Sequence, residues 1–171
     1  AYDDSLTGSS GDNALTGDSG IDTLEGGAGN DTLDGGADLD GASYASATSA
    51  VTVSLALTSA QNTGGAGIDT LTNIEGVLGS AYGDSLTGSS SADALIGEDG
   101  DDTLRGGAGN DVLFGGAGND TVVWAAGDGD DLVLLGTGTN TIDLGINTYT
   151  YVDSGNKRVF AIGSATVTVF D

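Results

Sequence analysis

Residues 97–123 read GEDGDDTLR GGAGNDVLF GGAGNDTVV, which are three nine-residue units in one unbroken register. Each unit begins with a glycine-rich hexapeptide whose sixth residue is Asp102, Asp111 or Asp120, and it ends with three residues that include an apolar one. Such hexapeptides are typical of turns, and the short runs that follow them are typical of strands. The stretch therefore predicts a repeated unit of one turn and one short strand.

The same period extends along the chain in both directions. Leucine fills the eighth position of the first units, as Leu6, Leu15, Leu24 and Leu33. Side chains alternate across a strand, so this position points inward while its neighbours point outward. Units fit the register at 8–16, 17–25, 26–34, 35–40 (the hexapeptide only), 64–72, 79–87 and 88–96, and with altered turns at 126–134 and 135–143.

One apolar residue per short strand cannot enclose a core, whereas two successive units that face each other can. A full coil then takes two units, and strands two units apart pair in a parallel sheet at roughly 4.8 Å spacing. The sequence predicts an all-β chain built as a parallel β-solenoid. Its core is a thin column of leucines, because 32 glycines and few aromatic residues leave little material for a thick one.

Changes in the repeat divide the chain into four parts. We expect a first repeat block at 1–40, a lateral insert strand with a linking repeat at 41–78, a second repeat block at 79–123, and degenerate coils with C-terminal capping strands at 124–171. The last part predicts a hairpin of 149–152 and 157–162, joined by 153–156, followed by a strand at 165–170. Its aromatic residues, Trp124 among them, predict a hydrophobic cap over the last coil. Because the chain starts partway through a unit and without Met, we interpret it as a piece of a longer protein.

The charge balance limits the possible partners. The chain carries 26 acidic and 3 basic residues, a net charge of −23. Such a surface repels nucleic acid and anionic membranes, and its natural partner is a cation. The same composition is typical of disorder, so we expect a chain that is unfolded without its counter-ion and ordered with it. There is no apolar run of about 18 residues that predicts a membrane span, and no signal peptide is visible.

Stacking brings the turns of successive coils together, and their sixth-position carboxylates repel each other unless an ion lies between them. Calcium takes six to eight oxygen ligands from carboxylates and carbonyls, which two facing turns offer. Magnesium prefers a tighter octahedron that retains water. Zinc prefers nitrogen or sulfur ligands, and the chain has no His and no Cys.

The units GGAGNDTLD, GGAGNDVLF and GGAGNDTVV resemble the calcium-binding nonapeptide of RTX (repeats-in-toxin) proteins. This resemblance implies a right-handed parallel β-roll in which Ca²⁺ ions lie between successive turns of one stack. It also implies that sixth-position aspartates and main-chain carbonyls of the first four positions hold the ions. The implied ligands are Gly17, Ser19, Gly20, Asp22, Gly26, Gly27, Ala28, Gly29, Asp31, Gly35, Gly36, Asp38, Asp40, Asp84, Asp93, Gly97, Asp99, Gly100, Asp102, Gly106, Gly107, Ala108, Gly109, Asp111, Gly115, Gly116, Ala117, Gly118 and Asp120.

Transferred to this chain, the resemblance implies four carboxylate pairs. These pairs are Asp22 with Asp40, Asp84 with Asp102, Asp93 with Asp111, and Asp102 with Asp120. Asn13 lies opposite Asp31 but carries an amide at the sixth position, which predicts a weak or empty site. Asp69, and Asp131 opposite Asp111, are possible further ligands.

The resemblance implies a non-catalytic, calcium-dependent module of a protein secreted by a Gram-negative bacterium through type I secretion machinery. The C-terminal residues 167–171 then resemble an uncleaved export signal. Two kinds of parent protein remain open. One is an enzyme such as a protease, lipase or alginate epimerase, and the other is an adhesin or surface-layer protein in which the module is structural.

Three other functions fit single features of the sequence. The adjacent acids Asp101 and Asp102, or Asp130 and Asp131, have the residue types of a catalytic carboxylate pair, although they fall on repeat positions. Trp124 and the terminal tyrosines have the residue types of a sugar-binding platform. The Thr-rich outward face has the composition of an ice-binding ladder, although its column is mixed in sequence.

Overall fold

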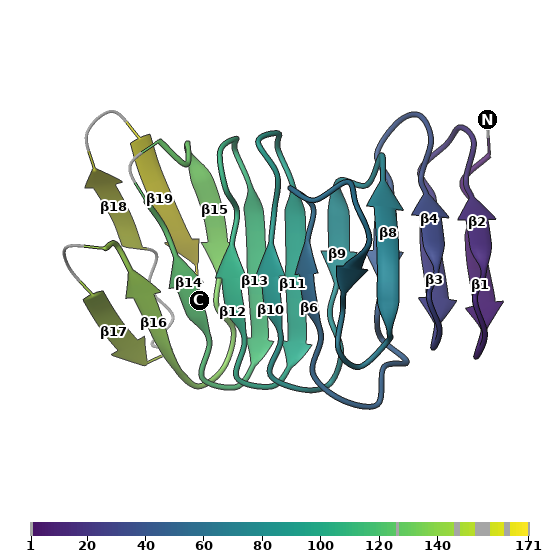
Figure 1. Cartoon of the computed structure of the whole chain (residues 1–171). Coiled ribbons are helices and arrows are strands. Elements are labelled where there is room, and N and C mark those ends of the chain that lie inside the picture. Colours follow the sequence, from purple (N-terminus) through teal and green to yellow (C-terminus); the bar gives the residue numbers. More distant parts are fainter. Residues whose placement is uncertain (1, 126, 146–147, 153–157, 163–164, 171) are drawn as a thin grey trace.

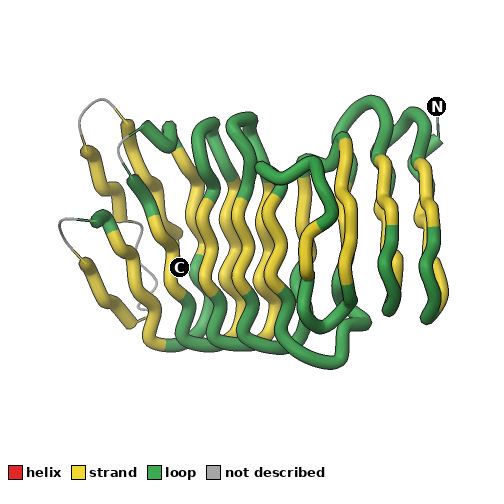
Figure 2. The backbone as a smooth tube through the Cα atoms, in the orientation of Figure 1, coloured by secondary structure: helices red, strands yellow, loops and turns green. Residues whose placement is uncertain are grey.

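The computed structural model describes residues 2–125, 127–145, 148–152, 158–162 and 165–170, and these residues form strands and turns without any helix (Figures 1 and 2). Accordingly, none of the described residues belongs to a helix that could cross a membrane. The strands are β1 (Ser5–Ser9), β2 (Ala14–Thr16), β3 (Thr23–Gly27), β4 (Thr32–Asp34), β5 (Gly41–Ser43), β6 (Thr52–Ser54), β7 (Gln61–Asn62), β8 (Ile68–Thr72), β9 (Gly76–Leu78), β10 (Ser85–Thr87), β11 (Ala94–Asp99), β12 (Thr103–Arg105), β13 (Val112–Ala117), β14 (Thr121–Val123), β15 (Asp131–Leu134), β16 (Thr139–Asp143), β17 (Thr148–Val152), β18 (Arg158–Ile162) and β19 (Ala165–Phe170).

Within the repeat blocks, successive strands alternate between opposite sides of a solenoid, and each strand pairs with the strand one coil away (Figure 1). One side is a nine-stranded sheet in the order β1-β3-β5-β9-β11-β13-β15-β19-β18. The other side consists of a four-stranded sheet, β2-β4-β8-β7, and a six-stranded sheet, β17-β16-β14-β12-β10-β6. Within the repeat blocks the pairing is parallel at the predicted offset of two units, as in Leu6 with Leu24 and Leu86 with Leu104. The predicted parallel β-solenoid is confirmed.

The core is the predicted column of eighth-position side chains. Leu24, Leu86, Leu95, Leu104 and Leu113 are all 0% exposed. They lie on both sides of the solenoid, so the leucines of one sheet meet those of the opposite sheet. Leu6 and Leu15, in the first coil, are only partly buried because no earlier coil within the chain covers them.

The insert predicted to lie at the side of the solenoid instead contributes strands to its sheets. Strand β6 is the first parallel strand of the six-stranded sheet, with Val53 beside Leu86. Strand β7 pairs antiparallel with β8, and the short connection after β8 leads into β9, which lies between β5 and β11.

From β13 to β15 the offset between paired residues is longer than in the repeat blocks, as in Leu113 with Val133, because the extra residues 124–125 lengthen the coil.

The predicted hairpin of 149–152 and 157–162 is wrong. Strand β17 pairs antiparallel with β16 at the edge of the six-stranded sheet, whereas β18 pairs antiparallel with β19 at the edge of the nine-stranded sheet. A solenoid has two open sheets, and each edge offers unpaired N–H and C=O groups. The two strands therefore cover one edge each in place of pairing with each other. The expected turn at 153–156 lies outside the described residues.

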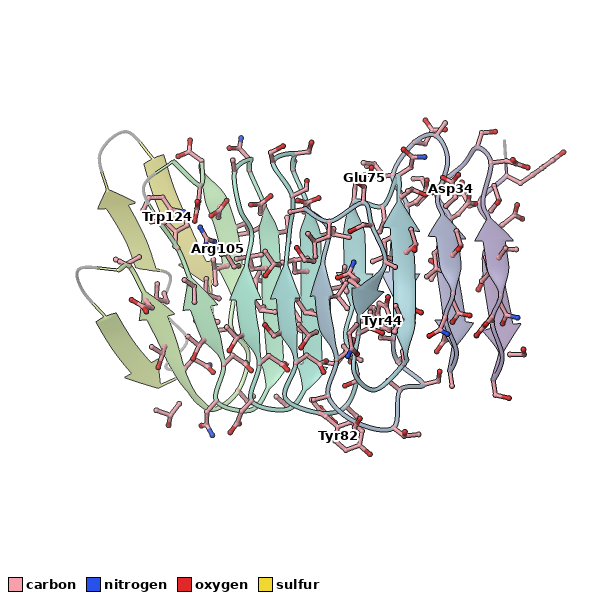
Figure 3. All side chains as sticks on the ribbon, viewed as in Figure 1. Asp34, Tyr44, Glu75, Tyr82, Arg105 and Trp124 are labelled. Atoms are coloured by element: carbon pink, nitrogen blue, oxygen red, sulfur yellow. The ribbon has the colours of Figure 1, made fainter. Side chains whose placement is uncertain are left out.

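The outward face of the six-stranded sheet carries two columns of side chains. On the six-stranded sheet the first outward column is Thr or Ser in each parallel coil, which is more regular than the sequence suggested, and it comprises Thr52, Ser85, Thr103, Thr121 and Thr141. The second column, which holds Thr87, Arg105 and Val123 among others, is mixed. Trp124, which was considered for a sugar-binding platform, is 1% exposed and belongs to the core (Figure 3).

Candidate metal centre

The sixth-position carboxylates form two ladders that run along the edges of the solenoid. In each step, one carboxylate oxygen accepts the main-chain N–H of the sixth residue one coil earlier. The four predicted pairs all stack in this way. The N–H of Asp22 donates to Asp40 at 2.8 Å, that of Asp84 to Asp102 at 2.8 Å, that of Asp93 to Asp111 at 2.9 Å, and that of Asp102 to Asp120 at 3.1 Å.

Three further steps join residues that the repeat made less certain. The N–H of Asn13 donates to Asp31 at 2.8 Å, that of Asp31 to Asp69 at 2.9 Å, and that of Asp111 to Asp131 at 3.0 Å. The series of Asp84, Asp102 and Asp120 ends where the N–H of Asp120 donates to Asn140 at 2.8 Å. Asn140 is not among the ligands predicted from the sequence, although its place in the nine-residue register makes it a sixth-position residue.

The second oxygen of most of these carboxylates has no partner. Seven sixth-position aspartates have a buried Oδ2 atom without a hydrogen bond, namely Asp22, Asp31, Asp40, Asp102, Asp111, Asp120 and Asp131. Burial of an unpaired carboxylate oxygen is costly, and buried charges are normally paired or bound to metals. These atoms are therefore the candidate ligands for a positive group.

A main-chain carbonyl lies beside each of several such atoms. A Cβ atom added to Gly17 would overlap both Asp22 Oδ2 and the carbonyl oxygen of Gly35 in the next coil. The same holds at Gly97, with Asp102 Oδ2 and the carbonyl oxygen of Gly115. The first glycine of the hexapeptide is thus required because a carboxylate oxygen and a carbonyl oxygen converge above it.

Asn140 shows how a turn satisfies itself without a cation. Its Nδ2 atom lies 3.4 Å from the carbonyl oxygen of Leu135 and 3.3 Å from that of Gly136, the first two positions of its turn. An amide can donate to these carbonyls, whereas a carboxylate can only accept. In the aspartate turns the equivalent atom is Oδ2, which cannot donate to these carbonyls.

The backbone conformation at the second position distinguishes two kinds of aspartate turn. In an open turn the Oδ2 atom of the sixth residue has no partner, and in the other kind a main-chain N–H reaches the carboxylate. The seven turns with an unpartnered Oδ2 have a positive φ there, as at Asp18 (69°), Gly36 (105°) and Glu98 (76°). Turns with Ser at this position instead donate its N–H to the sixth side chain, as Ser80 does to Asp84 at 2.6 Å and Ser89 to Asp93. A positive φ rotates the peptide so that the N–H no longer reaches the carboxylate.

The other predicted ligands within the turns have further contacts. The carbonyl of Ala117 accepts the N–H of Gly100 at 2.8 Å, and that of Gly116 accepts the N–H of Thr137 at 2.9 Å. Ser19 forms a parallel bridge with Ala37, and the side chains of Asp38 and Asp99 are exposed. Fourth-position glycines such as Gly118 (φ 146°) leave no room for a side chain, because a Cβ would overlap the carbonyl oxygen one coil away.

Fifth-position side chains form an additional ladder of hydrogen bonds, which was not predicted from the sequence. Asp101 accepts the N–H of Asn119 at 2.7 Å, and Asn119 in turn accepts the N–H of Thr139 at 2.9 Å. These side chains are exposed and reach the following coil, whereas the sixth-position side chains are buried and reach the preceding one. The adjacent acids Asp101 and Asp102 therefore have separate structural roles. The recurrence of Asn or Asp at position five was the available signal.

Asp69 differs from the other sixth-position aspartates because the insert satisfies it. Its Oδ2 atom accepts the hydroxyl of Thr63 at 3.0 Å, while its Oδ1 atom accepts the N–H of Asp31. The buried phenol of Tyr44 also lies close to this carboxylate, and burial together with the charge of Asp69 raises the pKa of Tyr44. The insert thus ends the ladder that starts at Asn13.

Burial makes the charged form of these carboxylates unfavourable. Desolvation raises the pKa of Asp102 to about 7, with the charges of Asp120 and Asp84 adding to the effect and the N–H of Asp84 opposing it. Desolvation raises the pKa of Asp131 to about 6, partly offset by the N–H of Asp111 and by Trp124. The same cause raises the pKa values of Asp31, Asp93, Asp111 and Asp120.

In EDTA, the chain is expected to gain stability as the pH falls from about 8 to about 5. A carboxyl whose folded pKa lies above 3.8 binds more protons in the folded state, so its stabilisation is complete below 3.8 and is lost as the pH rises through about 7 for Asp102. The sheet signal in far-ultraviolet circular dichroism, recorded in EDTA at each pH, reports the folded fraction that measures this. The trend should persist in about 1 M NaCl, which screens general repulsion. A folded fraction that rises with pH contradicts the prediction.

The nine-residue repeat is also the part of the chain that matches a known protein family. The RTX calcium-binding nonapeptide repeat matches in four copies, at residues 1–24, 7–41, 78–111 and 87–122, which together span half of the chain. The chain belongs to the RTX calcium-binding nonapeptide repeat family. RTX repeats bind calcium in general. The two matched regions correspond to the two repeat blocks, and they contain every aspartate with an unpartnered Oδ2 except Asp131.

A search among curated proteins gave no significant match. Among solved structures, this RTX chain is similar to the extracellular lipase LipA from Serratia marcescens, with 18% sequence identity and a TM-score of 0.29. The similarity covers 99% of this chain and 38% of the lipase chain.

No three carboxylates converge on one point among the described residues. Each candidate RTX site offers two stacked carboxylates, and main-chain carbonyls must supply the other oxygens. This combination fits the calcium ion, which accepts carbonyl oxygen readily. The orphaned Oδ2 atoms and the glycine cradles therefore fit the metal that the family binds.

Proposed function

We propose that this chain is a calcium-binding module that folds when Ca²⁺ fills its turns, and that it supports a larger secreted protein. One observation carries the proposal. Among the described residues, the buried Oδ2 atoms of seven sixth-position aspartates lack a hydrogen-bond partner, while Asn140, at the same place in its turn, donates to the first two main-chain carbonyls of that turn. A divalent cation supplies the missing positive charge at each aspartate turn.

The open turns indicate where the ions bind. The best-supported sites lie between Asp22 and Asp40, between Asp102 and Asp120, and between Asp111 and Asp131, where an orphaned Oδ2 faces a stacked acid. The pairs Asp84 with Asp102 and Asp93 with Asp111 stack equally well, but serine N–H groups already reach Asp84 and Asp93. Bound calcium neutralises the carboxylates and lets neighbouring coils approach.

The donor set explains the choice of metal. The oxygens come from carboxylates and main-chain carbonyls, and the sequence has no His and no Cys, the preferred ligands of zinc. The peptide turns hold several carbonyls in fixed positions, which suits the larger coordination number of calcium over the tight octahedron of magnesium.

The same carboxylates account for a switch between two compartments. At low calcium the charge of −23 and the buried acids oppose the compact state, which keeps the chain extended for export. Outside the cell, calcium at roughly 10⁻⁴ to 10⁻³ M is enough to fill extracellular modules of this kind. We place the protein outside a Gram-negative bacterium or on its surface, after passage through type I secretion machinery.

A calcium titration followed by far-ultraviolet circular dichroism tests the proposal. The spectrum in EDTA is expected to be that of a largely unfolded chain, and sheet signal should appear cooperatively with a midpoint of roughly 10⁻⁴ to 10⁻³ M calcium. Magnesium at the same concentration is the matched control and should give little signal. A spectrum that is the same in EDTA and in calcium would show that the proposal is wrong.

A further inference from the structure

The segment between the two repeat blocks contains a stacked turn that lacks the nonapeptide. Residues 73–75 replace the whole hexapeptide with Asn-Ile-Glu, because Thr72 ends β8 and Gly76 begins β9. The backbone of this short turn still joins the stack. The N–H of Glu75 donates to the carbonyl of Asp40, and the N–H of Ala94 in the next coil donates to the carbonyl of Glu75.

Asn73 and Glu75 take the places of the first and sixth residues of a turn. A Cβ added to Gly35 would overlap the carbonyl oxygen of Asn73 and lie 2.6 Å from Asp40 Oδ2. The same two kinds of oxygen surround Gly17, where they belong to Gly35 and Asp22. The N–H of Asp40 donates to Glu75 Oε2 at 3.0 Å, which is the hydrogen bond that a sixth-position aspartate accepts elsewhere. The longer glutamate side chain spans the distance that the short turn leaves open.

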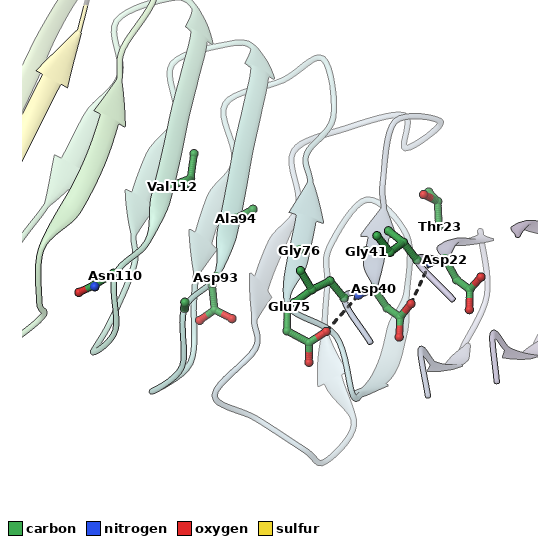
Figure 4. A pocket seen from close by; sticks show the side chains of 13 residues that line it. Asp22, Thr23, Asp40, Gly41, Glu75, Gly76, Asp93, Ala94, Asn110 and Val112 are labelled. Carbon is green, nitrogen blue, oxygen red and sulfur yellow. Dashed lines mark hydrogen bonds between the residues drawn. The ribbon is translucent and has the colours of Figure 1, made fainter. Parts of the chain in front are cut away.

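The carboxylate of Asp40 points to a ligand at this position. Asp40 is 3% exposed, and its Oδ2 atom has no hydrogen-bond partner. Figure 4 shows Asp22, Asp40 and Glu75 in one row, joined by the two hydrogen bonds, along the wall of a pocket of about 430 Å³.

We propose a further calcium site between Asp40 Oδ2, the carbonyl oxygen of Asn73 and the carboxylate of Glu75, outside the nonapeptide pattern. The proposal rests on the proposed function, since it uses the same ion. It extends the ion ladder of the first block across the connector, so that one ion links β5 to β9 and joins the two blocks. With fewer carbonyls than a full turn, this site binds calcium more weakly than its neighbours.

Glu75→Gln tests the site, with Glu25→Gln as the matched control. Each variant loses one negative charge, and each glutamine keeps the accepted main-chain hydrogen bond, from Asp40 to residue 75 and from Ser46 to residue 25 at 3.0 Å. Calcium bound per chain is measured by equilibrium dialysis with calcium alone. We expect Glu75→Gln to bind one ion fewer than the parent chain and Glu25→Gln to bind the same number.

Equal numbers and affinities in the parent chain and Glu75→Gln overturn this site while leaving the proposed function intact. A parent chain that binds no calcium overturns both. If Glu75→Gln does not regain the sheet spectrum in calcium, Glu75→Asp decides. It keeps the charge but is one methylene too short, so it should retain the fold and bind one ion more weakly, and unchanged binding overturns the site.

Discussion

Asp102→Asn is expected to have opposite effects with and without calcium. In calcium, the midpoint of the folding titration should rise by about tenfold or more, which corresponds to about 1.4 kcal/mol. Asp102 takes part in two stacked pairs, since one oxygen accepts the N–H of Asp84 and the other is the orphaned atom that faces the next coil. Equilibrium dialysis should also show at least one bound ion fewer.

In EDTA, the same substitution should stabilise the fold. Desolvation raises the pKa of Asp102 to about 7, so the buried charge opposes folding at neutral pH, and an amide removes that charge. Asn140 provides the structural precedent, because its amide donates to the carbonyls of the first two turn positions. At residue 102 the equivalent carbonyls belong to Gly97 and Glu98. The sheet signal of circular dichroism in EDTA should therefore be larger for Asp102→Asn than for the parent chain.

Asp101→Asn is the control for this pair of results. Asp101 is adjacent and carries the same charge, but it is exposed and accepts the N–H of Asn119, a role that Asn110 and Asn119 themselves fill in other coils. Its replacement should change neither the bound ions nor the calcium midpoint. A destabilisation of Asp102→Asn that is equal in EDTA and in calcium would contradict a role in metal binding.

Leu104→Ala should destabilise the folded, calcium-loaded chain by about 2–5 kcal/mol. Leu104 is 0% exposed and lies between Leu86 and Val122 in the six-stranded sheet. Each strand contributes a single inward side chain here, so no neighbour can move in to fill the cavity. Since small domains are stable by only about 5–15 kcal/mol, this loss is a large fraction of the total.

Thr103→Ala, on the outward face of the same strand, is the control and should stay within about 0.5 kcal/mol of the parent chain. Urea unfolding in saturating calcium measures both variants. The number of ions bound by the folded chain should be unchanged in Leu104→Ala, which separates a core defect from a lost ligand. A loss of stability below about 1 kcal/mol would show that the leucine column is not the core that holds the sheets together.

The nine-residue period was enough to predict the solenoid, its inward leucines and the stacking of Asp22 on Asp40 or Asp102 on Asp120. This follows because the fold is built from contacts between neighbouring coils, and the period alone fixes which residues are neighbours. The same repeat was enough to indicate the family. The period also places the fifth-position residues and Asn140 in register, although their roles become clear only from the hydrogen bonds.

The tertiary structure decided the features that break the period. Glu75 reaches the ladder from a turn of three residues, and Thr63 reaches Asp69 from the insert, because backbone stacking places them there without any local motif. The separate pairing of β17 and β18 likewise depends on which sheet edge remains open. Sequence spacing determines the contacts of a regular coil, whereas an interrupted coil takes its contacts from whichever groups its neighbours leave unpaired.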